Sequence, residues 1–118
     1  MTIVANTVVI LVAFLHIYFL ILEMFLWDKP SGLRAFGQTK EKAEATKVLA
    51  ANQGLYNGFL AAGLLLGVIQ GDSGIYFKLF FLSCVIVAGV YGALTASRKI
   101  LFIQAMPAFI GLILVVLS

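Results

Sequence analysis

The chain contains 118 residues, of which 63% are apolar and only 11% are charged, and its formal net charge is +3. Soluble domains contain about 25% charged residues, so this composition excludes a disordered tail, a disulfide-rich secreted domain and an ordinary soluble enzyme. The basic residues lie between apolar runs, where they set membrane topology. We therefore expect one integral membrane domain over residues 1–118 and no nucleic-acid partner.

Four apolar runs follow one another along the chain, and each is long enough to cross a bilayer. A transmembrane helix needs about 20 mainly apolar residues, and helices are the default because hydrocarbon offers the backbone no hydrogen-bond partners. The first run lacks the basic n-region and the cleavage site of a signal peptide. The sequence thus predicts an all-α, integral membrane four-helix bundle, with helices at about 3–27, 39–69, 75–95 and 99–117.

The first connecting segment predicts a turn followed by an early start of the second helix. Residues 28–32 have the Asp, Pro, Ser and Gly content of a turn, and residues 33–36 are expected at the membrane surface. Thr39 is a candidate N-cap, because it precedes a run of strong helix formers that begins at Lys40.

The distribution of basic residues predicts the orientation. The first segment contains five Lys and Arg residues and the third contains Arg98 and Lys99, whereas the second, residues 70–74, has none. The positive-inside rule places the first and third segments in the cytoplasm and both termini on the outer side. Trp27 is expected to anchor the first helix at the membrane interface.

The first helix carries two ionisable residues, His16 and Glu23. They are seven residues apart and therefore share one helix face, separated by about 10 Å along the axis. Ionisable groups within a membrane are costly and are functional candidates by default. Each also has a simpler interpretation, since His16 can be a packing residue and Glu23 can pair with Arg34 or a lysine of the first segment.

The second helix carries a polar face made of Asn52, Gln53, Tyr56 and Asn57. At about 100° per residue these side chains cover an arc about 140° wide. They are candidates for binding a ligand, although such amides also join transmembrane helices by hydrogen bonds.

Small residues follow a second pattern on the same helix. Gly54 and Gly58 have the spacing that lets two helices approach closely, and we expect them roughly opposite the polar face. Gly63 and Gly67 are expected beneath the polar face, where they would leave room for a ligand.

Two further polar residues, Tyr91 and Gln104, lie at a similar depth in the last two helices. Together with the first two helices they predict a pocket that opens to the cytoplasm. The chain has one His and one Cys, Cys84, so no zinc site or other protein-built metal site is expected. The residue content does not identify a cofactor, and haem with His16 as its single axial ligand is chemically compatible with it.

Two motifs resemble known families. The first joins His16, Glu23 and Trp27 to the segment 51–59, Ala-Asn-Gln-Gly-Leu-Tyr-Asn-Gly-Phe. It resembles a family of small bacterial membrane proteins of unknown function, which implies four helices and a multi-pass location in the bacterial inner membrane.

The second motif is weaker and lies in the second helix. Gln53 and the pair Tyr56-Asn57 are spaced like the Asn and Glu-Asn positions of the membrane-associated proteins in eicosanoid and glutathione metabolism. That resemblance implies a trimer of four-helix subunits. Gln replaces Asn and Tyr replaces Glu in this chain, and Lys47 is the nearest cation to the motif.

Three functions are compatible with these residues. In a membrane enzyme or lipophilic-ligand binder, His16 or Tyr56 would be the acid or base, Glu23 would set the charge, and Asn52 and Asn57 would hold the substrate. In a proton-coupled small transporter, Glu23 would exchange a proton for a cation. The third is an accessory subunit. Each is expected as a homo-oligomer in the lipid bilayer, with a trimer favoured over a dimer.

Overall fold

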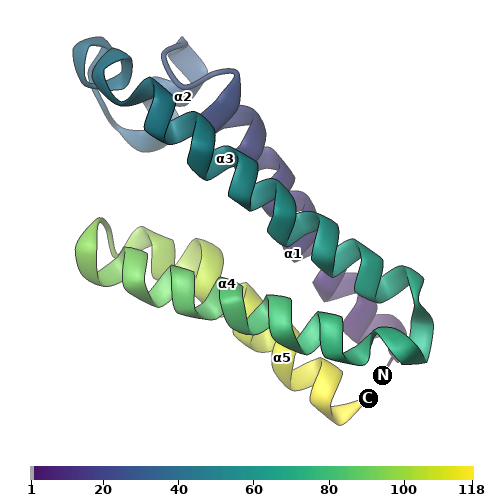
Figure 1. Cartoon of the computed structure of the whole chain (residues 1–118). Coiled ribbons are helices and arrows are strands. Elements are labelled where there is room, and N and C mark those ends of the chain that lie inside the picture. The colour runs from purple at the N-terminus through teal and green to yellow at the C-terminus, as the bar shows by residue number, and fades with distance from the viewer. Residues whose placement is uncertain (1) are drawn as a thin grey trace. The chain divides into compact units, whose positions relative to one another are not determined.

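The computed structural model describes residues 2–118, and within this range the regular elements are all helices joined by short turns, with no strand (Figure 1). Its α-helices are α1 (Thr2–Met24), α2 (Pro30–Phe36), α3 (Lys40–Ile69), α4 (Ile75–Thr95) and α5 (Met106–Leu117). A 3₁₀ turn, η1 (Gly71–Gly74), precedes α4, and a π-helical segment, η2 (Leu101–Ala105), precedes α5. The all-α class predicted from the sequence is confirmed.

The connection after α1 contains a helix that the sequence did not predict. α1 ends at Met24, so Trp27 lies in the following turn rather than in the helix. Pro30 begins α2, at a position where a backbone N–H would have no hydrogen-bond partner within the helix. Gly37 ends α2 in the left-handed conformation at φ 58°, which favours glycine. The apolar segment predicted at the membrane surface is therefore part of a seven-residue helix.

The start of α3 follows the predicted capping chemistry. The backbone N–H of Lys42 donates to Oγ1 of Thr39 at 3.2 Å, which satisfies one of the unpaired donors of the first turn. Thr39 is thus confirmed as the N-cap, and α3 begins at Lys40.

The last helical run is interrupted near a proline. The backbone is helical from Lys99, but residues 101–105 have π geometry, and the N–H of Met106 donates to the carbonyl of Leu101. Pro107 follows directly and has no N–H to donate to a preceding carbonyl. The irregular hydrogen bonding is therefore placed at the proline, where a regular α-helix would lose one bond in any case.

The chain divides into two compact units, and each is described by itself. The first contains residues up to 14 and residues 60–118, and the second contains residues 15–59. In the first unit, Val9, Leu82 and Val85 are fully buried. A Cβ added to Gly89 would lie 2.8 Å from the backbone nitrogen of Ala105, so glycine permits the close packing of α4 on η2.

The first unit also fills the space that was expected to be open beside two glycines of α3. The ring of Phe81 lies where a Cβ of Gly63 would be, and Lys78 and Gly74 pack against Gly67. The expected ligand space at these glycines is therefore absent, because side chains of α4 occupy it. The buried Lys78 donates a hydrogen bond to Oδ1 of Asn6 at 3.1 Å.

Two segments are long and apolar enough to cross a membrane, Thr2–Met24 and Gly71–Thr95, and Leu101–Leu117 is a shorter apolar helix. α3 is longer than either segment, but its sequence is not apolar enough to be counted as a membrane-spanning helix. Its amides at Asn52, Gln53 and Asn57 lower its hydropathy. The four-span topology therefore remains a prediction.

Candidate functional site

The site lies in the second unit, where the end of α1 packs against the first half of α3. Gly54 makes this contact close, since a Cβ added there would lie 2.7 Å from Cγ of Met24 and 3.1 Å from Cβ of Glu23. Gly58 faces the same helix, with its Cβ position 2.7 Å from Cδ1 of Leu20. The small side chains of α3 thus bring its backbone against α1.

This contact corrects the predicted division of α3 into opposite faces. Asn57 and Gly54 are three residues apart, which places them about 60° apart around the helix axis. Both therefore face α1, so Asn57 lies beside the glycines rather than opposite them. Asn52 and Tyr56 lie farther around the helix from Gly54, and both are exposed.

Glu23 is the centre of the site. Its side chain is 2% exposed, although it lies near the end of a strongly apolar helix. Nε2 of Gln53 donates to Oε2 of Glu23 at 2.5 Å, and Nδ2 of Asn57 donates to Oε1 at 2.5 Å. Two amides one turn apart on α3 therefore hold both oxygens of one carboxylate.

Glu23 has no cationic partner in the part of the chain that the structure describes. The expected pairing with Arg34 or a lysine of the first segment is absent there, because the ion pair of this segment joins Lys47 to Asp28 at 3.1 Å. The carboxylate is instead stabilised by neutral donors, as buried polar groups usually are.

Trp27 forms the second part of the site. Its Nε1 donates to Oγ1 of Thr46 at 3.1 Å, and Thr46 in turn donates to the carbonyl of Lys42 at 2.8 Å. The ring of Phe36 from α2 packs against the indole with centroids 4.8 Å apart. The turn after α1 is thereby held against α3 and α2.

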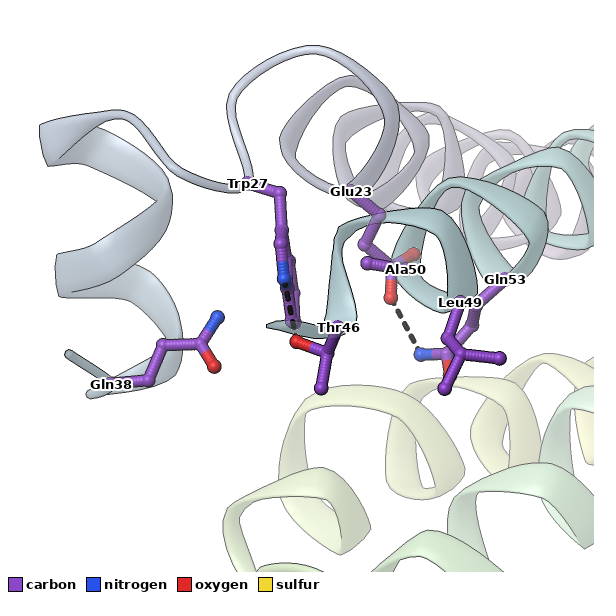
Figure 2. Close-up of a pocket in the computed structure, with 7 residues that line it drawn as sticks. All are labelled: Glu23, Trp27, Gln38, Thr46, Leu49, Ala50 and Gln53. Carbon is purple, nitrogen blue, oxygen red and sulfur yellow. Dashed lines mark hydrogen bonds between the residues drawn. The ribbon is translucent and has the colours of Figure 1, made fainter. Parts of the chain in front are cut away.

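A pocket of about 270 Å³ lies between these groups (Figure 2). Its polar lining comes from Glu23, Gln38, Thr46 and Gln53, and its apolar lining from Trp27, Leu49 and Ala50. Figure 2 shows the side chain of Gln38 extending toward Trp27 from the segment between α2 and α3. Nε2 of Gln38 is buried and has no hydrogen-bond partner in the structure. The pocket therefore contains one carboxylate and one unused amide donor.

The comparisons with known proteins identify the family. The family model described as "Protein of unknown function (DUF1304)" matches residues 10–116. The chain belongs to this family. It is also similar to "Uncharacterized protein YpaA" of Lactococcus lactis subsp. lactis (strain IL1403), with 32% identity over 115 residues, or 96% of this chain and 97% of the relative. No solved structure gives a significant match. The predicted resemblance to a family of unknown function is confirmed, and the match includes every residue of the pocket.

The other predicted site residues of this DUF1304 protein are not among the residues that line the pocket. His16 is fully buried and packs edge-on against Phe19, with ring centroids 5.4 Å apart. Tyr56 is 60% exposed and lies beside Phe59. Tyr91 and Gln104 belong to the first unit, which is described separately. No group of three or more His, Cys, Asp or Glu side chains able to hold a metal occurs within residues 2–118.

Five of the seven residues that line the pocket were not predicted as site residues, namely Trp27, Gln38, Thr46, Leu49 and Ala50. A signal for two of them was present in the sequence. Thr46 precedes Gln53 by seven residues and so shares its helix face, and Trp27 follows Glu23 by four. Gln38 had no such signal, because the turn between α2 and α3 decides its position.

The ion pair beside the pocket has its own electrostatic consequence. The hydrogen bond from Lys47 lowers the pKa of Asp28 below its usual value, because it favours the charged carboxylate. Lys47 is largely exposed, with 55% of its side chain accessible. Asp28 therefore remains negative at neutral pH and links the turn after α1 to α3.

Proposed function

We propose that this DUF1304 protein is a multi-pass membrane protein that binds a small ligand in the pocket beside Glu23. The observation that carries the proposal is the buried carboxylate held by two amides at the wall of a 270 Å³ pocket. Ligand sites are typically concave and mostly apolar, with a few polar groups that fix the ligand's orientation. This pocket combines three apolar residues with four polar ones, so it offers a ligand more polar contacts than such sites usually do.

The membrane location rests on the apolar helices and on the surface they expose. Thr2–Met24 and Gly71–Thr95 are long enough to span, and α5 with η2 adds a shorter apolar segment. Large apolar side chains such as Leu11, Phe80 and Val87 are more than half exposed along these helices. A soluble monomer rarely exposes so much contiguous apolar surface. We propose that α3 is the fourth span and that the bacterial inner membrane covers these faces.

The pocket belongs to the cytoplasmic end of the helices in this proposal. It is formed where α1 ends and α3 begins, next to the segment that contains Lys29, Arg34, Lys40, Lys42 and Lys47. Under the positive-inside rule this basic segment is cytoplasmic. A ligand would therefore enter from the cytoplasm or from the inner leaflet.

Binding is supported better than catalysis by the arrangement of the side chains. The two groups proposed as acid or base, His16 and Tyr56, do not line the pocket. A general acid or base must come within hydrogen-bond reach of the reacting group. Glu23 and Gln53, which do line the pocket, are suited to holding a polar group of a ligand.

Native mass spectrometry of the protein released from a mild detergent tests this proposal. We expect a homo-oligomer, with a trimer favoured, that carries a small additional mass. Glu23→Gln should lose that mass, while Glu41→Gln, the same change on an exposed carboxylate of α3, should retain it. A protein without any bound mass, or an identical mass on both variants, would contradict binding at Glu23.

A second candidate function is a proton-coupled transporter. It is favoured by a specific observation, since Glu23 is a carboxylate within an apolar helix and has only neutral hydrogen-bond partners. Intramembrane carboxylates commonly serve as proton carriers. Cation uptake into proteoliposomes that is driven by a pH gradient should then disappear in Glu23→Gln. Cation uptake that this substitution leaves unchanged would exclude the transporter.

A further inference from the structure

The pocket contains a buried carboxyl group that no cation among the described residues pairs with. The carboxylate of Glu23 is 2% exposed, and the amides of Gln53 and Asn57 that bind it have no net charge. Within residues 2–118 the lysines and arginines form one ion pair, between Lys47 and Asp28. Buried charges in proteins are usually paired. A positively charged ligand would supply the missing partner.

The carboxylate retains the capacity to bind such a ligand. A carboxylate has about four lone-pair positions, and each oxygen of Glu23 accepts one amide hydrogen bond. The amides therefore fix the orientation of the carboxylate without using all of its acceptor positions. The pocket lies directly beside it.

The remaining lining suits an organic cation that also carries an oxygen. The indole of Trp27 lines the pocket, and indole has the strongest attraction for cations among aromatic side chains. Nε2 of Gln38 supplies a hydrogen-bond donor without a protein partner. An ammonium group near Glu23 and Trp27 and an acceptor oxygen near Gln38 would match all three.

We infer that the ligand is a small organic ammonium ion with a hydrogen-bond-accepting oxygen, an inference that rests on the proposed binding function. The pocket has a volume of about 270 Å³, just below the range of about 300–1,000 Å³ that is typical of sites for drug-sized ligands. This is enough for an amino alcohol the size of choline.

The test uses a matched pair of probes, choline and its uncharged isostere 3,3-dimethyl-1-butanol, in which carbon replaces the ammonium nitrogen. Trp27 is the only tryptophan of the chain and lines the pocket, so its fluorescence reports binding directly. Choline chloride replaces sodium chloride at constant ionic strength in a nonionic detergent. We expect saturable binding of choline that is at least about tenfold tighter than that of the alcohol.

Variants then test whether Glu23 is the residue that recognises the positive charge of choline. Glu23→Gln should weaken choline binding by about tenfold or more and leave the alcohol unchanged, while Glu41→Gln should change neither. Circular dichroism and gel filtration verify that Glu23→Gln is folded. If it is not, the comparison of the two probes on the unmodified protein still decides the inference.

Each outcome has a defined meaning. Equal affinities for choline and the alcohol would overturn the ammonium inference and leave the proposed binding function intact. The absence of choline binding at saturating concentration would also overturn it, and the mass spectrum would decide separately whether another ligand binds. The source of the ammonium group is tested in nanodiscs at a salt concentration that screens the surface charge of phosphatidylglycerol. Weaker choline binding in phosphatidylcholine than in phosphatidylglycerol would then identify a lipid headgroup, and equal binding a free cation.

Discussion

At the scale of single residues, the two amides that hold Glu23 differ in their burial. Asn57 is 9% exposed, whereas Gln53 is exposed on the edge of α3. A hydrogen bond to a charged group contributes about 1.5–3 kcal/mol in soluble proteins, but hydrogen bonds between transmembrane helices average about 0.6 kcal/mol. Asn57 should therefore be the more important donor, because water cannot replace it.

Replacing Asn57 tests this difference. Asn57→Ala should lower the free energy of unfolding by about 1–2 kcal/mol, and Gln53→Ala should lower it by less. The measurement is reversible unfolding in mixed micelles. Asn52→Ala is the matched control, because Asn52 is exposed on the same helix and its loss should cost less than about 0.5 kcal/mol. Equal costs at Asn52 and Asn57 would show that the bond to Glu23 contributes nothing.

The Asp28–Lys47 pair predicts a pH dependence. Lys47 lowers the pKa of Asp28, so the folded state favours the charged carboxylate. The stabilisation is fully present above the ordinary pKa of Asp, about 3.9, and is lost as the pH falls through the lowered value. Asp28→Asn should reduce the melting temperature slightly at neutral pH and not at all in strong acid. A difference that is constant across the pH range would contradict the pair's contribution.

At the scale of helices, the contact between α1 and α3 depends on glycines with different surroundings. Next to Gly54 lie Cγ of Met24, Cβ of Glu23 and the backbone oxygen of Leu20, all within 3.2 Å of an added Cβ. Next to Gly58 lies only the end of the Leu20 side chain, at 2.7 Å. The Leu20 side chain beside Gly58 can change rotamer. The atoms beside Gly54 belong to the backbone or lie close to it, so they cannot move as easily.

Alanine at the two glycines should therefore have unequal effects. Gly54→Ala should separate α1 from α3, weaken the bonds to Glu23, and shift the emission of Trp27. Gly58→Ala should be tolerated, because Leu20 can move and alanine has a better helix propensity by about 1 kcal/mol. Thermal unfolding and Trp27 fluorescence measure both effects. Equal behaviour of the two variants would mean that close packing at Gly54 does not hold the site.

At the scale of the whole molecule, the basic residues predict which ends of the helices face the cytoplasm. The connection around Arg98 and Lys99 is expected inside, and the connection at residues 70–74 outside. Both connections have exposed positions, Asp72 in the one and Ser97 in the other. These positions allow the orientation to be measured directly.

Single cysteines provide that measurement. Cys84 is the only cysteine of the chain, so Cys84→Ser gives a background without thiols. In intact cells a membrane-impermeant maleimide should label Asp72→Cys and should label Ser97→Cys only after the cells are permeabilised. Labelling of Ser97→Cys in intact cells would reverse or exclude the proposed topology.

The sequence by itself determined the helical class and several helix boundaries. Continuous apolar runs leave the backbone to satisfy its own hydrogen bonds, so the helical class follows from composition and run length. Thr39 was recognisable as an N-cap because capping is local chemistry within four residues. Glu23, Gln53 and Asn57 were recognisable because polar side chains in apolar helices are costly.

Only the tertiary structure decided which of these polar groups meet. The rotation of α3 about its axis sets whether Gln53 and Asn57 or Asn52 and Tyr56 face α1, and that rotation follows from the fit of Gly54 against Met24 and Glu23. The short helix α2 and the turn after it bring Phe36 and Gln38 to Trp27. Such contacts join residues far apart in the chain, and they depend on packing that helical periodicity does not contain.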